Sequence, residues 1–127
     1  MQILSNSEAF AIRGGECSIP IDMSQHDFQF TRNWFKHRNQ STWSTFLRPM
    51  FVDFREGLEI PQPVRMVQIG VFEGQDLVWC LQHILTHPNS SVIAIDPWFP
   101  TTKLSVEFMG ACYDRAMHNL KPWESKV

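Results

Sequence analysis

The sequence predicts an α/β fold in which two parallel strands are joined by a helix. Two short apolar segments, at 64–71 and 92–96, are each followed by a segment with apolar residues at helical spacing. Gly70 lies at the end of the first apolar segment, and Gly74 opens the helical pattern after it. The order strand, helix, strand, helix is typical of a parallel βαβ unit with a right-handed crossover.

Composition and charge argue against several classes of protein. The chain has 127 residues, which suits one domain, and 43% of them are hydrophobic, which is too many for disorder. Its formal charge of -2 argues against binding of nucleic acid through phosphate attraction. No apolar run reaches the roughly 20 residues of a membrane span, and the N-terminus does not resemble a signal peptide. We therefore expect neither a nucleic-acid partner nor a membrane partner.

The cysteines and histidines give no sign of a disulfide framework or a metal site. Cys17, Cys80 and Cys112 lie far apart and form no CxxC motif. His83 and His87 are four residues apart, but no further ligand follows them at a suitable spacing. We expect reduced thiols, a cytoplasmic protein and no metal.

Two segments precede the strand–helix unit. Residues 1–27 are polar and mixed, with Pro20 among their breakers, and are predicted to form a loose arm. Residues 28–60 are predicted to form a helical segment, with one or two short helices broken near Arg38–Ser41. Residues 53–64, rich in glycine and proline, are expected to be a connector. The large apolar residues that indicate helix are Phe30, Trp34, Phe35, Trp43, Phe46, Leu47 and Phe51.

The remaining residues, 61–127, carry the strand–helix pattern. A buried strand is predicted over Val64–Val71, and Asp76 is expected to cap the helix that follows. A second buried strand is predicted at 92–96, and a second helix ends near Leu120. The apolar positions of the two helices are Leu77, Val78, Leu81, Ile84 and Leu85 in the first and Leu104, Phe108, Ala111, Cys112 and Met117 in the second. Trp79, Cys80 and Cys112 are predicted to lie in the core.

The two glycines and one acid indicate a nucleoside site. Gly70 allows a tight turn with positive φ, and Gly74 lets backbone approach a ligand without a Cβ in the way. The N-terminus of the helix adds unpaired N–H groups and a partial positive charge. Asp96 lies at the end of the second predicted strand, 22 residues after Gly74, at the separation where an acid accepts hydrogen bonds from ribose hydroxyls.

Two longer stretches resemble a known family. The stretch "VRMVQIGVFEGQDLVWCLQHILTHPNSSVIAIDPW" is similar to the opening half of a class I S-adenosylmethionine-dependent methyltransferase, of the small-molecule methyltransferase-24 type. The preceding "FQFTRNWFKHRNQSTWSTFL" resembles the helical lead-in of some of these proteins. The similarity covers about residues 28–120 and is specific at Gly70–Asp76 and Asp96–Trp98. It implies a Rossmann-like parallel sheet, S-adenosylmethionine as cofactor and methyl transfer to a small molecule.

The resemblance also implies which residues bind the cofactor. Gly70 would let the chain pass beneath the methionine part, while Gly74 would allow close approach. Asp96 matches the acid that binds the ribose. Further residues would line the turn or flank the adenine, and the full set is Gln68, Gly70, Phe72, Glu73, Gly74, Asp76, Asp96, Pro97 and Trp98.

This sequence departs from the family pattern at two of these positions. Asp76 stands where the family usually has serine or threonine, and its carboxylate would lie beside the carboxylate of the cofactor. Gln68 stands where the family often has glutamate, so the attraction for the positive charges of the cofactor is weakened there.

The resemblance extends to only part of the family's fold. A complete fold of that family has a seven-stranded sheet, whereas this chain matches the first two strand–helix units. Residues 121–127 resemble the approach to a third strand. We therefore expect a fold truncated after the second unit and a chain that is inactive alone, without an assignable catalytic residue. The methyl acceptor stays unidentified, and the exposed edge of the first strand of the sheet is expected to cause self-association.

Two alternative functions stay open at the level of sequence. A truncated or degenerate Rossmann module could act as a non-catalytic binding or scaffold domain, which the departures at Gln68 and Asp76 favour. A fragment of a nicotinamide-dependent oxidoreductase is the other alternative. The middle glycine of the dinucleotide fingerprint is missing, which argues against it.

Overall fold

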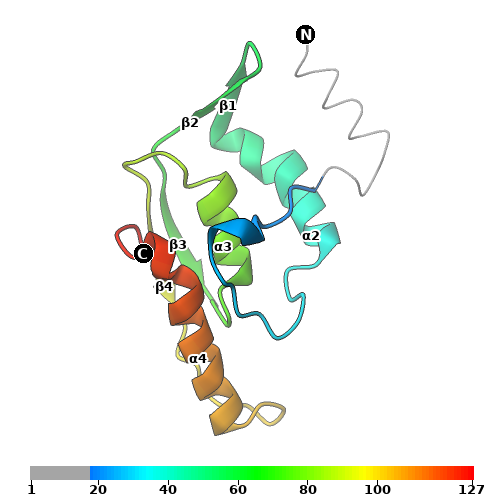
Figure 1. The fold of residues 1–127 in the computed structure, drawn as a ribbon, viewed down its shortest axis with the longest axis vertical. Helices are drawn as coiled ribbons and strands as arrows, with labels where there is room; N and C mark the ends of the chain where they lie inside the picture. The colour runs from blue at the N-terminus through cyan, green and yellow to red at the C-terminus, as the bar shows by residue number, and fades with distance from the viewer. Residues whose placement is uncertain (1–17) are drawn as a thin grey trace.

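The computed structural model describes residues 18–127 as a mixed α/β arrangement with three helices and two small sheets. The helices are α2 (His37–Thr42), α3 (Gln75–His83) and α4 (Val106–Leu120). The strands are β1 (Val52–Arg55), β2 (Leu58–Pro61), β3 (Arg65–Ile69) and β4 (Ser91–Ile95). Figure 1 shows the hairpin of β1 and β2 projecting at one end of the molecule and α4 extending toward the other.

The parallel unit predicted from the sequence is confirmed. Strands β3 and β4 pair in parallel from Arg65 opposite Ser91 to Ile69 opposite Ile95, and α3 connects them. The described residues contain this one parallel pair, and β1 and β2 form a separate antiparallel sheet. The larger parallel sheet that the resemblance implies is therefore not seen in residues 18–127.

The parallel pair is covered on one face only. Met66 and Val92 point inward and pack with residues of α3 and α4 in the main apolar cluster. On the opposite face the apolar side chains are exposed, with exposed fractions of 60% for Val67, 83% for Ile69, 64% for Ile93 and 48% for Ile95. We call these four residues the outer sheet face. The prediction of fully buried strands is wrong for this face, because both helices lie on the other one.

Helix α3 forms the centre of the core. Trp79 is completely buried, and its indole N–H donates to the carbonyl oxygen of Ile19 at 2.7 Å. The buried residues of α3 include Leu77, Val78 and Leu81, which the helical spacing predicts, and Trp79 and Cys80, which were also expected in the core. The N-cap is Gly74, whose carbonyl accepts from Val78 N at 2.8 Å, so the prediction that Asp76 caps this helix is wrong. Asp76 lies inside the first turn, because the positive φ of Gly74 already ends the loop there.

The segment before the parallel unit differs from the prediction in two ways. Helix α2 continues without a gap into a π-helical turn at Trp43–Leu47 and a 3₁₀ turn at Arg48–Met50, so the expected break at Arg38–Ser41 is absent. The described part of the predicted arm, residues 18–27, is held on α3. Gln82 binds Asp22 N at 2.8 Å through its side-chain oxygen.

The predicted connector at 53–64 contains a β-hairpin. Glu56 and Gly57 both have positive φ, of 51° and 78°, and form the two-residue turn between β1 and β2. Two positive φ values in succession give the turn that matches the twist of hairpin strands. The connector prediction is therefore wrong over the residues of β1 and β2.

Two cysteines lie in the described part of the chain, and both are buried and free, as predicted for core residues. Burial raises the pKa of the Cys80 thiol to about 12, and the charge of Asp76 adds to the effect. Such a thiol stays protonated and is a poor nucleophile. Cys17 lies outside the described residues.

Within residues 18–127 we find no helix long and apolar enough to cross a membrane.

Candidate functional site

The loop between β3 and α3, residues 70–74, carries three backbone conformations with positive φ. The φ angles are 85° at Gly70, 55° at Phe72 and 80° at Gly74. This loop lies at the carboxyl end of β3, where Gly70 N donates to Ile95 O of β4 at 2.9 Å. The ends of the two strands therefore meet beside the N-terminus of α3, which is the arrangement predicted from the glycines.

The two glycines of this loop have different surroundings. A Cβ atom added at Gly70 would meet nothing within 4 Å, whereas one added at Gly74 would lie 3.6 Å from the side chain of Leu120. Gly74 is buried and faces α4. Of the two, Gly70 has open space beside it, while Gly74 serves the turn and the packing of α3 on α4.

Asp96 links the end of β4 to residues 70–74, which we call the glycine loop. One carboxylate oxygen accepts from the backbone N–H groups of Val71 at 2.7 Å and Phe72 at 2.8 Å. The other accepts from Trp98 N at 2.7 Å. Partial burial would raise the pKa of this carboxyl, but the hydrogen bonds from Phe72, Trp98 and Val71 outweigh it and lower the pKa. Three of the roughly four acceptor positions of a carboxylate are thus filled within the chain.

Trp98 closes the same cluster from the β4 side. Its φ is 45°, and its indole N–H donates to Phe72 O at 2.9 Å. Its ring packs edge-on against Tyr113 of α4, with 5.1 Å between the ring centroids. Pro97 is exposed. Trp98 therefore binds the loop and α4 in this structure.

Glu73 is completely buried, and it contacts residues from segments that are distant in the sequence. Its carboxylate accepts from Thr31 N at 2.9 Å, from the Thr31 hydroxyl at 2.8 Å and from the Trp34 indole N–H at 2.8 Å. Arg115 Nη1 of α4 lies 3.5 Å from the same carboxylate. The Glu73 backbone carbonyl accepts from Asn119 at 2.9 Å. These contacts compensate the buried charge and leave the carboxylate little capacity for a ligand.

Gln68 of β3 and Asp76 of α3 are joined by a hydrogen bond between their side chains. The Gln68 side-chain amide donates to the Asp76 carboxylate at 2.9 Å and to Gly70 O at 3.1 Å. The second carboxylate oxygen of Asp76 accepts from Leu77 N at 2.9 Å. Burial raises the pKa of Asp76, although these hydrogen bonds oppose the effect.

A pocket of about 250 Å³ opens between the glycine loop and the segment that contains α2. Four of the predicted site residues line it, namely Gly70, Phe72, Glu73 and Asp76. Gln68, Gly74, Asp96, Pro97 and Trp98 are not among its lining residues. The structure therefore separates the predicted site into two parts. One is the pocket beside α2, and the other is the group at the end of β4 formed by Asp96 and Trp98 with the backbone of Val71 and Phe72.

Sequence reasoning missed the opposite wall of the pocket. That wall consists of Trp34, Phe35, Asn39 and Trp43, with Gln75 at the start of α3. The large apolar residues in this stretch predict only one or two short helices, and nothing in their spacing indicates that Trp34 is 37% exposed. The signal that could have found them is the resemblance to a helical lead-in, which covers the same residues.

Comparisons with known proteins give no neighbour for this chain: no protein-family model, no curated protein and no solved structure matches it. Within residues 18–127, no three histidine, cysteine, aspartate or glutamate side chains are grouped so that they could hold a metal ion.

Proposed function

We propose that residues 18–127 form the cofactor-binding part of an S-adenosylmethionine-dependent methyltransferase that acts on a small molecule. The observation that carries the proposal is the position of Asp96. Its carboxylate lies at the end of β4 and directly contacts the glycine loop at the end of β3. A nucleoside bound over these strand ends would meet an acid for the ribose and the N-terminus of α3 at the same time.

The geometry of Asp96 leaves room for one ribose contact. The oxygen that binds Trp98 N accepts a single hydrogen bond in this structure, and a carboxylate oxygen has two acceptor positions. A ribose hydroxyl would donate to the remaining position. A second ribose contact would require the bonds to Val71 N or Phe72 N to open.

A non-catalytic binding module is the second candidate, and the same residue favours it. Asp96 makes three hydrogen bonds to the backbone, so its presence is explained without a ligand. The pocket of about 250 Å³ is also smaller than the roughly 300–1,000 Å³ that is usual for sites of drug-sized ligands. In this alternative the glycine loop and Asp96 serve the fold, and the protein binds a partner through another surface.

Calorimetric titration of the full chain distinguishes these candidates. S-adenosylhomocysteine, the product form of the cofactor, is expected to bind with measurable heat, while NAD is expected to give none. Binding of NAD alone would favour the oxidoreductase alternative. If neither compound binds, the methyltransferase proposal fails, and the result favours the non-catalytic binding module.

A further inference from the structure

The pocket between the glycine loop and α2 has walls of aromatic rings. Trp34 and Phe72 meet edge-on with 4.8 Å between their ring centroids, and Phe35 and Trp43 do so with 4.7 Å. All four residues line the pocket. In each pair the edge of one ring meets the other ring, and the faces of aromatic rings attract cations.

One cation already lies on this aromatic surface. The guanidinium carbon of Arg32 is 5.6 Å from the centroid of the Trp34 ring. Arg32 and Trp34 are both exposed, and Arg32 is not among the residues that line the pocket. It demonstrates that the Trp34 ring is accessible to positive charge.

The pocket also contains one carboxylate without a cationic partner. Of its two acids, Glu73 is matched by Arg115 at 3.5 Å. The ion pairs among residues 18–127 are Arg48–Glu59, Arg55–Asp53 and Arg115–Glu73, and none of them includes Asp76. Asp76 is bound by Gln68 and by Leu77 N, which are neutral donors. Its pKa is raised by burial, as expected for a carboxylate that lacks a counter-charge.

The N-terminus of α3 does not cancel this charge. A helix N-terminus carries roughly half a positive elementary charge, and the Asp76 carboxylate in the first turn carries a full negative one. The other pocket-lining residues of α3 and α2, Gln75 and Asn39, are neutral amides. The lining of the pocket therefore combines aromatic rings with one carboxylate, that of Asp76, which has no cationic partner among the described residues.

We infer that this pocket binds a small organic cation of the quaternary ammonium class. Such a ligand has no N–H group that demands a hydrogen bond, so aromatic faces suit it, and its charge would pair with Asp76. A neutral ligand of the same shape would leave Asp76 without a counter-charge, and an anion would be repelled by it. The inference goes beyond the proposed function, because it rests on the pocket and not on Asp96, and it stands or falls independently of nucleoside binding.

Choline and its neutral isostere 3,3-dimethylbutan-1-ol test the charge requirement. Both are titrated into the ¹⁵N-labelled full chain, and the indole N–H signals of Trp34 and Trp43 report on the pocket walls. Choline is expected to bind at least about tenfold more tightly than the isostere, since the two differ only in charge. Equal affinity for both compounds, or no shift of either indole signal, would overturn the inference.

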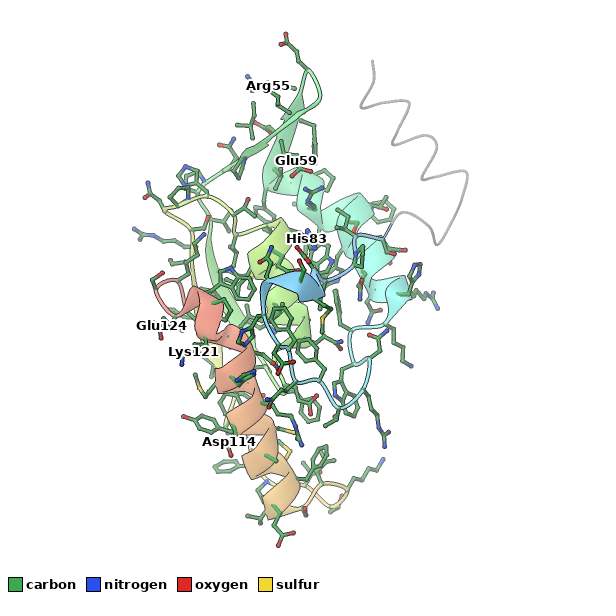
Figure 2. All side chains as sticks on the ribbon, in the orientation of Figure 1. Arg55, Glu59, His83, Asp114, Lys121 and Glu124 are labelled. Carbon is green, nitrogen blue, oxygen red and sulfur yellow. The ribbon has the colours of Figure 1, made fainter. Side chains whose placement is uncertain are left out.

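A matched pair of variants tests the role of Asp76. Asp76→Asn removes the charge at nearly constant shape and is expected to weaken choline binding about tenfold while leaving the isostere unaffected. Asp114→Asn removes the same charge from an exposed position on α4, on the side away from α2 (Figure 2), and should change neither affinity. An equal loss in both variants would show a general effect of net charge and would contradict a site at Asp76.

Titration of the same samples with S-adenosylhomocysteine keeps the two proposals separate. Its sulfur is uncharged, so it tests the nucleoside contacts without a sulfonium. Choline binding without S-adenosylhomocysteine binding supports this inference and removes the methyltransferase proposal. The reverse result does the opposite. If Asp76→Asn does not fold, the comparison of choline with its isostere on the unaltered chain still decides the inference.

Discussion

Asp96 compensates two strained residues. Phe72 and Trp98 are bulky aromatic residues with positive φ, a conformation that costs of order 1–3 kcal/mol each. Both of their backbone N–H groups donate to the Asp96 carboxylate, and the Trp98 indole donates to Phe72 O. One charged side chain therefore holds both strained positions, which makes Asp96 a structural residue whether or not it binds a ribose.

Replacement of Asp96 should consequently destabilise the fold. We expect Asp96→Ala to lower the free energy of unfolding by about 1.5–3 kcal/mol at neutral pH, the usual worth of hydrogen bonds to a charged group. Urea unfolding followed by circular dichroism measures the difference, with Asp114→Ala as an exposed control. Equal stability of Asp96→Ala and the parent protein would contradict the role assigned here.

The effect of Asp96 should also depend on pH. Because the folded-state pKa lies below the ordinary value of 3.8, the stabilisation is complete above the unfolded-state pKa. It is lost as the pH falls through the folded-state pKa. The difference between Asp96→Ala and the parent protein should therefore be constant between pH 6 and pH 7 and shrink below about pH 4.

Glu73 illustrates what a sequence cannot reveal about single residues. The resemblance placed it correctly in the turn, but nothing local indicates that its side chain is completely buried. Its partners are Thr31, which is 42 residues earlier, and Arg115 on α4. Burial of a charge depends on such distant partners, so it follows from tertiary packing and not from the residues next to Glu73.

At the scale of elements, the helices and strands were predicted where apolar residues recur at regular spacing, and they were missed where that spacing is irregular. The positions of β3, α3, β4 and α4 follow from apolar spacing and from Gly70 and Gly74. The hairpin was missed because its turn is Glu56–Gly57, without the asparagine or aspartate that usually signals one. The continuous helical stretch at 37–50 was missed because its polar residues at 38–41 interrupt the apolar pattern. Two of these, Gln40 and Ser41, are in fact buried.

The two glycines around the loop should respond differently to alanine. Both have positive φ, so Gly70→Ala and Gly74→Ala should each lower the free energy of unfolding by about 1–2 kcal/mol. Only Gly70 lines the pocket, and Gly74 faces Leu120. We therefore expect only Gly70→Ala to weaken choline binding among molecules that remain folded. Urea unfolding and titration of both variants provide the measurement, and loss of binding in Gly74→Ala alone would show that the pocket assignment is wrong.

For the whole molecule, the two edges of the parallel pair are not equivalent. Along β4, Val92 N donates to Lys126 O at 2.8 Å, and the Lys126 ammonium binds Leu85 O at 2.7 Å, so the C-terminal segment covers the beginning of that edge. Along β3, no second strand pairs within the described residues. The exposed edge expected from the sequence was that of the first strand, which is β3. The cover that Lys126 gives to β4 was not expected, because it depends on how 121–127 folds back.

The free edge of β3 and the outer sheet face together favour association of two copies of the chain. A row of unpaired backbone groups next to exposed valine and isoleucine is the feature that natural edge strands usually avoid. We expect the molar mass measured by light scattering to rise with protein concentration.

Ile69→Lys places a charge at the most exposed position of the outer sheet face, where 83% of the side chain is accessible. This variant should stay monomeric at concentrations where the parent associates. Leu58→Lys is the matched control, because Leu58 is 67% exposed but lies in the other sheet, and it should associate like the parent. A parent chain that stays at 14.8 kDa at every concentration, or equal loss of association in both variants, would show that β3 is not the contact.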